Sequence, residues 1–298
     1  MKKIHLVIIA LLAATCSLEG CKPNTSKAAE ASTETLASND NKATSDNLLA
    51  TDSIEYDQAM CHIKVDYPTA GQDSLASAVR QYISKELEEL YLPAMNGEEN
   101  VTPVIYKGEL NDGKKLIDFY GKANSDYLTG TQKELADLNS AHQDHLSYEI
   151  NIRKTEETST YVTYQSWTYN YMGGAHGSAF NHSANISKAT GKPVTATIDT
   201  LKVKELQPLL KKGVLSYLNA SNPDEKVTEE QLADYLFIDN GIIPVPAFTP
   251  YLTKEGVCFI YQQYEIGPYA LGMVTFTVPY TEIKPFLTPE ARKLLTEE

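Results

Sequence analysis

A strand-like run meets a glycine-rich turn in the stretch Thr160-Tyr161-Val162-Thr163-Tyr164-Gln165-Ser166-Trp167-Thr168-Tyr169-Asn170-Tyr171-Met172-Gly173-Gly174-Ala175-His176-Gly177. Up to Tyr171 the side chains alternate between two faces, as they do along a β-strand. Gly173 and Gly174 tolerate positive φ, so the chain can reverse tightly there and offer backbone amides beside His176. Residues 147–156 alternate in the same way. The sequence therefore predicts two successive antiparallel strands, joined by a polar turn around Glu157.

The rest of the chain also switches between strand and helix periods. We expect a helix to begin at Asp73 or Ser74, and another over residues 114–143 to break at Thr129-Gly130. Such runs of strands and helices predict an α+β fold with antiparallel sheet packed against helices, in two sequential subdomains over residues 54–172 and 173–298. The remaining expected strands cover residues 61–67, 179–187, 246–252, 257–264 and 273–278, and the remaining expected helices cover residues 200–218, 228–236, 280–286 and 289–296.

The first 53 residues resemble a lipoprotein leader and its linker. Lys2 and Lys3 precede a short apolar run that closes on Leu18-Glu19-Gly20-Cys21, which resembles a bacterial lipobox. We expect residues 1–20 to be a signal peptide and Cys21 to be the acylated first residue, in the cell envelope at the outer membrane or periplasmic face. Residues 21–53 have no aromatic residue, cannot offset their ordering entropy by burial, and so predict a flexible tether.

Charge and cysteine content narrow the classes of function. The formal net charge is −13, which disfavours nucleic acid and anionic lipid as partners and favours a cationic one, although it also serves simple solubility. In an exported protein, Cys61 and Cys258 can form a disulfide. The alternative is two separate buried thiols, because both cysteines lie in strand-like runs.

Two turns hold the candidate site residues. The first is the glycine-rich turn, where Gly174 offers backbone amides and His176 offers a base or a hydrogen-bond donor. The second is Tyr264-Glu265-Ile266-Gly267-Pro268-Tyr269-Ala270-Leu271-Gly272, in which Glu265 can hold a cation or pair with His176. In each case a purely structural role is the alternative: a turn histidine bonded to a carbonyl, or an acid that accepts backbone amides.

Aromatic residues on the strand before the glycine turn suggest a platform. Tyr161, Trp167, Tyr169 and Tyr171 share one face, whereas Tyr164 lies on the other. Exposed rings on a sheet can bind sugar rings or side chains of a partner, and the alternative is a face packed beneath helices.

Several catalytic signatures are missing from the sequence. It contains no Gly-x-Ser-x-Gly elbow, no phosphate-binding glycine loop and no His-Glu-x-x-His. His142 and His145 lie three apart without an evident third ligand, so we expect neither a metal nor a cofactor.

The stretch from about residue 54 to 285 resembles the extracellular domain of RsiV-type anti-sigma factors, a two-part domain also found beside peptidoglycan deacetylases and in envelope lipoproteins. The resemblance rests on Ile63-Lys64-Val65-Asp66-Tyr67-Pro68, on Gly173-Gly174-Ala175-His176-Gly177, on the Thr190-Gly191 turn and on the run from Phe248 to Gly272. In RsiV-type proteins the domain binds lysozyme. The resemblance thus implies recognition of a lysozyme-like protein or of cell-wall glycan. This chain departs from the pattern in lacking both a transmembrane helix and a deacetylase domain.

The sequence therefore predicts a lipid-anchored envelope binding protein without enzymatic activity. Its expected recognition surface contains Gly174, His176, Glu265, Tyr269 and Trp167. One alternative is a glycan-active hydrolase with His176 and Glu265 as acid and base. Another is a structural or assembly lipoprotein in which the two turns only shape the sheet.

Overall fold

The computed structural model describes residues 48–69, 73–99, 101–138, 145–221 and 226–295. The chain divides into two units, Met1–Asn47 and Leu48–Glu298, and the second unit contains the whole of the described fold. The expected signal peptide, Cys21 and most of the tether lie outside the described residues. Within the described part, no helix has the length and apolar character needed to cross a membrane.

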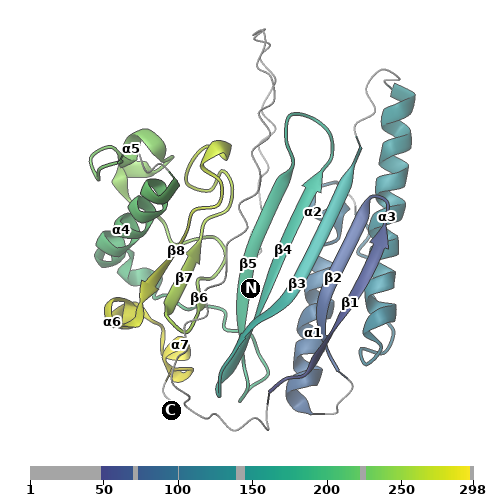
Figure 1. Cartoon of the computed structure of the whole chain (residues 1–298), viewed down its shortest axis with the longest axis horizontal. Helices are drawn as coiled ribbons and strands as arrows, with labels where there is room; N and C mark the ends of the chain where they lie inside the picture. Colours follow the sequence, from purple (N-terminus) through teal and green to yellow (C-terminus); the bar gives the residue numbers. More distant parts are fainter. Residues whose placement is uncertain (1–47, 70–72, 100, 139–144, 222–225, 296–298) are drawn as a thin grey trace, which may run out of the picture. The chain divides into compact units, whose positions relative to one another are not determined.

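A five-stranded mixed sheet forms the first part of the fold, in the spatial order β1-β2-β3-β4-β5 (Figure 1). All neighbouring strands are antiparallel except β2 and β3, which are parallel. The α+β class is confirmed, and the parallel pair corrects the expectation of a purely antiparallel sheet. It arises because helices separate β2 from β3 in the chain, and such a crossover can return the chain in the same direction. The strands are β1 (Thr51–Gln58), β2 (Cys61–Pro68), β3 (Ser147–Glu157), β4 (Tyr161–Tyr171) and β5 (Ser178–Ser187).

Strand β1 was not expected, and it begins within the last residues of the predicted tether. It is an edge strand without a buried residue, and only Ile54 and Tyr56 alternate toward the core, which is too short an apolar pattern to reveal a strand. Its pairing with β2 from Thr51↔Pro68 to Gln58↔Cys61 supplies the order that its own sequence does not indicate.

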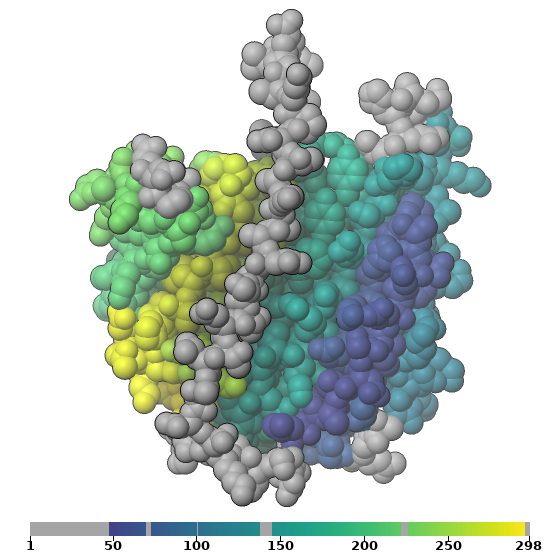
Figure 2. Space-filling model, viewed as in Figure 1, coloured from purple at the N-terminus to yellow at the C-terminus, as the bar shows by residue number. Residues whose placement is uncertain are grey.

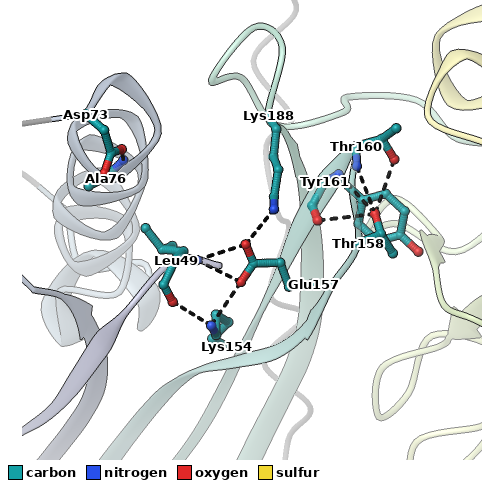
Figure 3. Close-up of polar contacts among 9 residues, drawn as sticks. All are labelled: Leu49, Asp73, Ala76, Lys154, Glu157, Thr158, Thr160, Tyr161 and Lys188. Carbon is teal, nitrogen blue, oxygen red and sulfur yellow. Dashed lines mark hydrogen bonds and ion pairs between the residues drawn. The ribbon is translucent and has the colours of Figure 1, made fainter. Parts of the chain in front are cut away.

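Three helices cover one face of this sheet: α1 (Ser74–Glu89), α2 (Leu92–Met95) and α3 (Gly113–Leu138). Helix α1 begins as predicted, because the Asp73 carboxylate accepts a hydrogen bond from the Ala76 amide at 2.6 Å (Figure 3). The predicted break at Thr129-Gly130 is wrong, since α3 is continuous through both residues. One unfavourable glycine costs only about 1 kcal/mol, which packing of a long helix offsets.

The second part of the fold builds its own core around the three-stranded antiparallel sheet β6-β7-β8. The expected strand over residues 246–252 shrinks to Tyr251–Leu252, because Pro246 and Pro250 remove backbone donors. The expected helix over 228–236 shrinks to four residues. The elements are α4 (Val203–Ser221), α5 (Leu232–Tyr235), β6 (Tyr251–Leu252), β7 (Gly256–Ile260), β8 (Thr275–Pro279), α6 (Tyr280–Ile283), α7 (Pro289–Lys293) and the 3-10 turns η1 (Thr200–Lys202), η2 (Asp239–Gly241), η3 (Tyr269–Leu271) and η4 (Lys284–Phe286).

Side-chain amides join this second part to the outer edge of β5. Gln262 accepts from the Asn181 amide at 2.9 Å and donates to the Asn181 carbonyl at 2.8 Å, while Gln263 accepts from the Ala179 amide at 3.1 Å. The two glutamines thus satisfy backbone groups that an edge strand would otherwise leave unpaired. Because β5 pairs with β4, it continues the first sheet beyond the predicted subdomain boundary at residues 172–173; the boundary itself stays a prediction.

The possible disulfide between Cys61 and Cys258 is not formed, and both are buried free cysteines. Cys61 lies on β2 in the first core, whereas Cys258 lies on β7, outside that core. Burial raises the pKa of the Cys61 thiol to about 12, with a smaller opposing effect from Ser125. The alternative of two separate buried thiols therefore holds.

An ion-pair cluster fixes the point where the chain enters the fold (Figure 3). This Glu157 cluster consists of Leu49, Lys154, Glu157 and Lys188. The Glu157 carboxylate accepts from the Leu49 amide at 2.9 and 3.1 Å and pairs with Lys154 at 3.0 Å and Lys188 at 2.6 Å. Burial would raise the pKa of Glu157, but the hydrogen bonds from Lys188, Leu49 and Lys154 outweigh it, and the net shift is downward. The start of the described chain is therefore held firmly against the β3–β4 hairpin.

Candidate functional site

The glycine turn after β4 forms as the sequence predicts. Gly173 and Gly174 have φ values of 92° and 95°, in the region that favours glycine. The Tyr171 hydroxyl closes the turn by donating to the Gly174 carbonyl at 2.8 Å. A Cβ added at Gly174 would meet no atom within 4 Å, so this residue is required for its backbone conformation and not for space.

His176 follows this turn and meets Tyr269, as predicted, together with Tyr264. The imidazole stacks on the Tyr269 ring with centroids 3.7 Å apart, and its Nε2 lies 3.3 Å from the Tyr264 hydroxyl. The Tyr269 hydroxyl donates to the Gly177 carbonyl at 3.1 Å, which ties the two turns together. We call His176, Tyr264 and Tyr269 the aromatic cluster. His176 and Tyr264 are exposed, so the cluster presents its rings to solvent.

Tyr264 adopts a backbone conformation that a bulky residue rarely takes. Its φ is 66°, in the left-handed region, and its side chain remains 57% exposed. Such a conformation costs on the order of 1 kcal/mol or more and persists only where the surroundings enforce it. No burial of the ring compensates for this strain, so the position is a candidate for function.

Glu265 enforces the turn that carries Tyr264. One carboxylate oxygen accepts from the Ala247 amide at 2.6 Å and the other accepts from the Gln262 amide at 2.7 Å. Burial raises the pKa of Glu265, and the two backbone amides only partly oppose this shift. No contact joins Glu265 to His176 among the described residues, so the structure does not bring this predicted pair together. Glu265 instead shapes the loop and thereby positions Tyr264.

Trp167 lies apart from the aromatic cluster, on the sheet face that the helices leave open. It is half-buried, and its ring is nearly parallel to that of Tyr169, with centroids 6.4 Å apart. Tyr169 in turn packs over Gly177, where an added Cβ would lie 2.5 Å from the ring. The sequence assigns the aromatic residues of β4 to the correct faces of the strand. Tyr161, however, is buried in the second core, so only part of the predicted aromatic face is open.

Three contributing residues were not identified from the sequence as parts of the site. Tyr264 was noted only as a neighbour of Glu265, and Gln262 and Gln263 were not considered. The pair of glutamines that follows the apolar strand β7 after Tyr261 is the one signal that points to a capped strand edge. No local pattern indicates positive φ at a tyrosine.

Metal chemistry finds no support in the described part of the chain. No group of three His, Cys, Asp or Glu side chains lies close enough to hold an ion there. His142, one of the two spaced histidines, lies outside the described residues.

The fold and the site define an α+β protein that presents exposed aromatic rings at the end of a mixed sheet. Residues 199–281 match the model of a family described as a protein of unknown function, DUF3298. A search of curated proteins gives no significant match.

Two solved structures described as DUF3298 family proteins have a similar fold. The protein from Bacteroides fragilis is 21% identical, with a TM-score of 0.58 over 84% of this chain and 98% of that one. The protein from Pseudomonas aeruginosa is 13% identical, with a TM-score of 0.52 over 83% and 97% of the two chains. At these identities the likeness concerns the fold alone. The chain thus carries a domain of unknown function, and the RsiV-type resemblance is not confirmed by these matches.

Proposed function

We propose that this protein is a lipid-anchored, non-enzymatic binding protein of the cell envelope and that the aromatic cluster is its recognition centre. The observation that carries the proposal is Tyr264, which is held in a strained conformation by Glu265 while its ring stays exposed. Strain maintained without burial is a feature of binding sites, where it prepares a side chain for its ligand.

The ligand that suits this centre best is a cationic protein of the lysozyme type. Lysine and arginine side chains bind the faces of exposed aromatic rings. The net charge of −13 would steer such a partner toward the chain. Peptidoglycan is the alternative ligand, because tyrosine rings also stack on sugar rings.

The geometry of Glu265 favours binding over hydrolysis. An acid–base pair needs both groups within reach of one substrate atom. Both Glu265 oxygens are engaged by backbone amides, and His176 Nδ1 lies 3.0 Å from the Gly177 carbonyl. These contacts leave Glu265 a structural task and orient the His176 ring, so the rings of the aromatic cluster are the exposed chemistry.

Titration of residues 22–298 against a c-type lysozyme, with muramidase activity measured at low and moderate salt, tests the proposal. We expect inhibition that weakens with salt and is reduced about tenfold or more by His176→Ala and Tyr269→Ala. The control is His145→Ala, which changes an exposed histidine outside the cluster. Absence of binding at tens of micromolar (about −6 to −7 kcal/mol) would exclude lysozyme and move the search to peptidoglycan fragments. If His176→Ala only shifted the melting temperature, the assembly alternative would hold.

The lipid anchor has a separate test. Cys21→Ala in the full chain should move the protein from the membrane fraction to the soluble fraction, because acyl chains supply the attachment. Cys16→Ala, which changes a cysteine inside the expected signal peptide, is the matched control. An unchanged distribution in Cys21→Ala would refute lipidation at this residue.

A further inference from the structure

The open face of the five-stranded sheet carries a row of polar side chains centred on Trp167. The strand register places five residues side by side across all five strands. From β1 to β5 they are Glu55, Lys64, Asn151, Trp167 and Asn181. Figure 2 shows this side of the molecule, with β1 and β2 in purple and β3 and β4 in teal. This row shares no residue with the aromatic cluster.

A shallow groove of ≈200 Å³ lies along the β1–β4 part of this row, and Asn181 on β5 pairs with Trp167 just outside its lining. Its lining includes Asp57, His62, Lys64, Glu149, Asn151 and Trp167. The volume is below the ~300–1,000 Å³ of pockets that enclose drug-sized ligands, so it suits about one ring of a ligand that lies across the sheet.

Most charges in the groove are already paired across the strands. His62 Nδ1 lies 2.6 Å from the Asp57 carboxylate, and the Lys64 ammonium pairs with Glu55. Glu149 adds a further carboxylate, so the groove would repel an anion. A neutral ligand with hydrogen-bonding groups is therefore the best match to these side chains.

Two unpaired acceptors flank the indole of Trp167. The Oδ1 atoms of Asn151 and Asn181 are buried, and neither has a hydrogen-bond partner within the described part of the chain. Both asparagines are direct cross-strand neighbours of Trp167. A buried acceptor without a donor is unfavourable, and such groups are rare in folded proteins. A ligand that seats against Trp167 with hydroxyl or amide donors on both sides would satisfy them.

We infer that the open sheet face around Trp167 is a saccharide site, where a neutral pyranose ring stacks on the indole and donates hydrogen bonds to Asn151 and Asn181. The half-buried indole gives the ring an apolar face, and the nearly parallel Tyr169 ring extends the apolar surface along the strand. The paired charges and amides around it supply the polar contacts. This inference does not depend on the aromatic cluster being a recognition centre.

The single tryptophan of the chain makes the test direct, because tryptophan emission reports on Trp167 alone. The full chain in detergent is titrated with a neutral N-acetylglucosamine trimer, a neutral glucose trimer and, as the contrast, an anionic uronic acid trimer. We expect the neutral trimers to shift the emission and to protect Trp167 from acrylamide quenching. The anionic trimer should bind at least about tenfold more weakly.

Variants separate the site from other saccharide contacts. Asn151→Ala and Asn181→Ala should each weaken binding about five- to tenfold, because each removes one acceptor. The matched control is Asn96→Ala, which removes the asparagine at the C-cap of α2 and leaves the sheet face intact. His176→Ala should leave the saccharide titration unchanged and weaken only lysozyme inhibition.

Three results would overturn the inference. One is the absence of any change in Trp167 emission or quenching with millimolar neutral trimer. Another is calorimetric binding that leaves the emission unchanged, since it would place the sugar elsewhere. The third is undiminished affinity in the Asn151→Ala, Asn181→Ala double variant, provided that its circular dichroism and melting temperature match the wild type.

Discussion

The two faces of the five-stranded sheet are made by the same strands but carry different chemistry. On β2 and β3 the side chains of Ile63, Val65 and Ile150 are at most 2% exposed beneath the helices, while their immediate neighbours on the open face are polar residues. Each second residue therefore serves folding, and the residues between them are free to serve binding. The difference predicts that stability and ligand affinity can be changed independently.

The difference between the two faces is tested most directly by truncating two adjacent residues of β3, one in each of two variants. Ile150→Ala, on the covered face, should lower the free energy of unfolding by about 3 kcal/mol, because it leaves a cavity in a close-packed core. Asn151→Ala, on the open face, should change it by about 0.5 kcal/mol or less, since it removes an unpaired acceptor. Urea unfolding followed by circular dichroism measures both. Equal losses would mean that the open face is also part of the folding core.

Substitution of Glu157 tests whether the stability of the fold at the Glu157 cluster depends on an ionised acid. Glu157→Gln should cost about 2 kcal/mol at neutral pH, because Lys154 and Lys188 lose their carboxylate. The lowered pKa of Glu157 means that its contribution is present above about pH 4.3 and is lost as pH falls through the folded-state value. Urea midpoints at pH 7, 5 and 3.5, chosen around that ordinary pKa, should therefore show a smaller acid loss in the variant.

Glu265 provides the opposite pH behaviour in the same molecule. Its raised pKa means that its contribution is fully present below the ordinary value of a glutamate and is lost as pH rises through the folded-state value. For Glu157, the contradicting outcome is a Glu157→Gln variant that loses as much stability between pH 7 and pH 3.5 as the wild type. The acid dependence would then not belong to the Glu157 cluster.

Substitution of Tyr264 should affect stability and binding in opposite directions. Tyr264→Gly removes the strain of positive φ and should raise the free energy of unfolding by about 1 kcal/mol, while it weakens lysozyme inhibition. Thermal unfolding and the inhibition titration measure the two effects. Phe237→Gly, at another exposed aromatic residue, is the control and should not gain stability. If Tyr264→Gly were less stable than the wild type and inhibited lysozyme normally, the strained conformation of Tyr264 would have no role in binding.

The smallest expected effect lies in the helices that cover the sheet. Gly130→Ala in α3 should stabilise the protein by about 0.5–1 kcal/mol, because alanine favours the helix and its Cβ meets no atom within 4 Å. Thermal unfolding again provides the measurement. Gly213→Ala in α4 is the opposite case and should destabilise, since its Cβ would lie 2.2 Å from the Phe276 ring.

Much of the local structure follows from the sequence because its causes are local. The alternation of residues 61–67 and 160–171 marks two strands, Asp73 caps a helix, and paired glycines turn the chain before His176. The failures have equally physical causes. The apolar period of the edge strand β1 is only two residues long, and the weak helix penalty of Gly130 is overridden by packing.

By itself the sequence determined the class of fold, the alternation that separates the two sheet faces, and the aromatic and glycine residues of the two turns. Only the tertiary structure decided the parallel pairing of β2 with β3, the engagement of Glu265 by backbone amides and the meeting of His176 with Tyr264, 88 residues away. The reason is that dihedral preferences and side-chain periods act within a few residues. Which strands pair and which turns touch depends instead on burying the whole apolar surface at once.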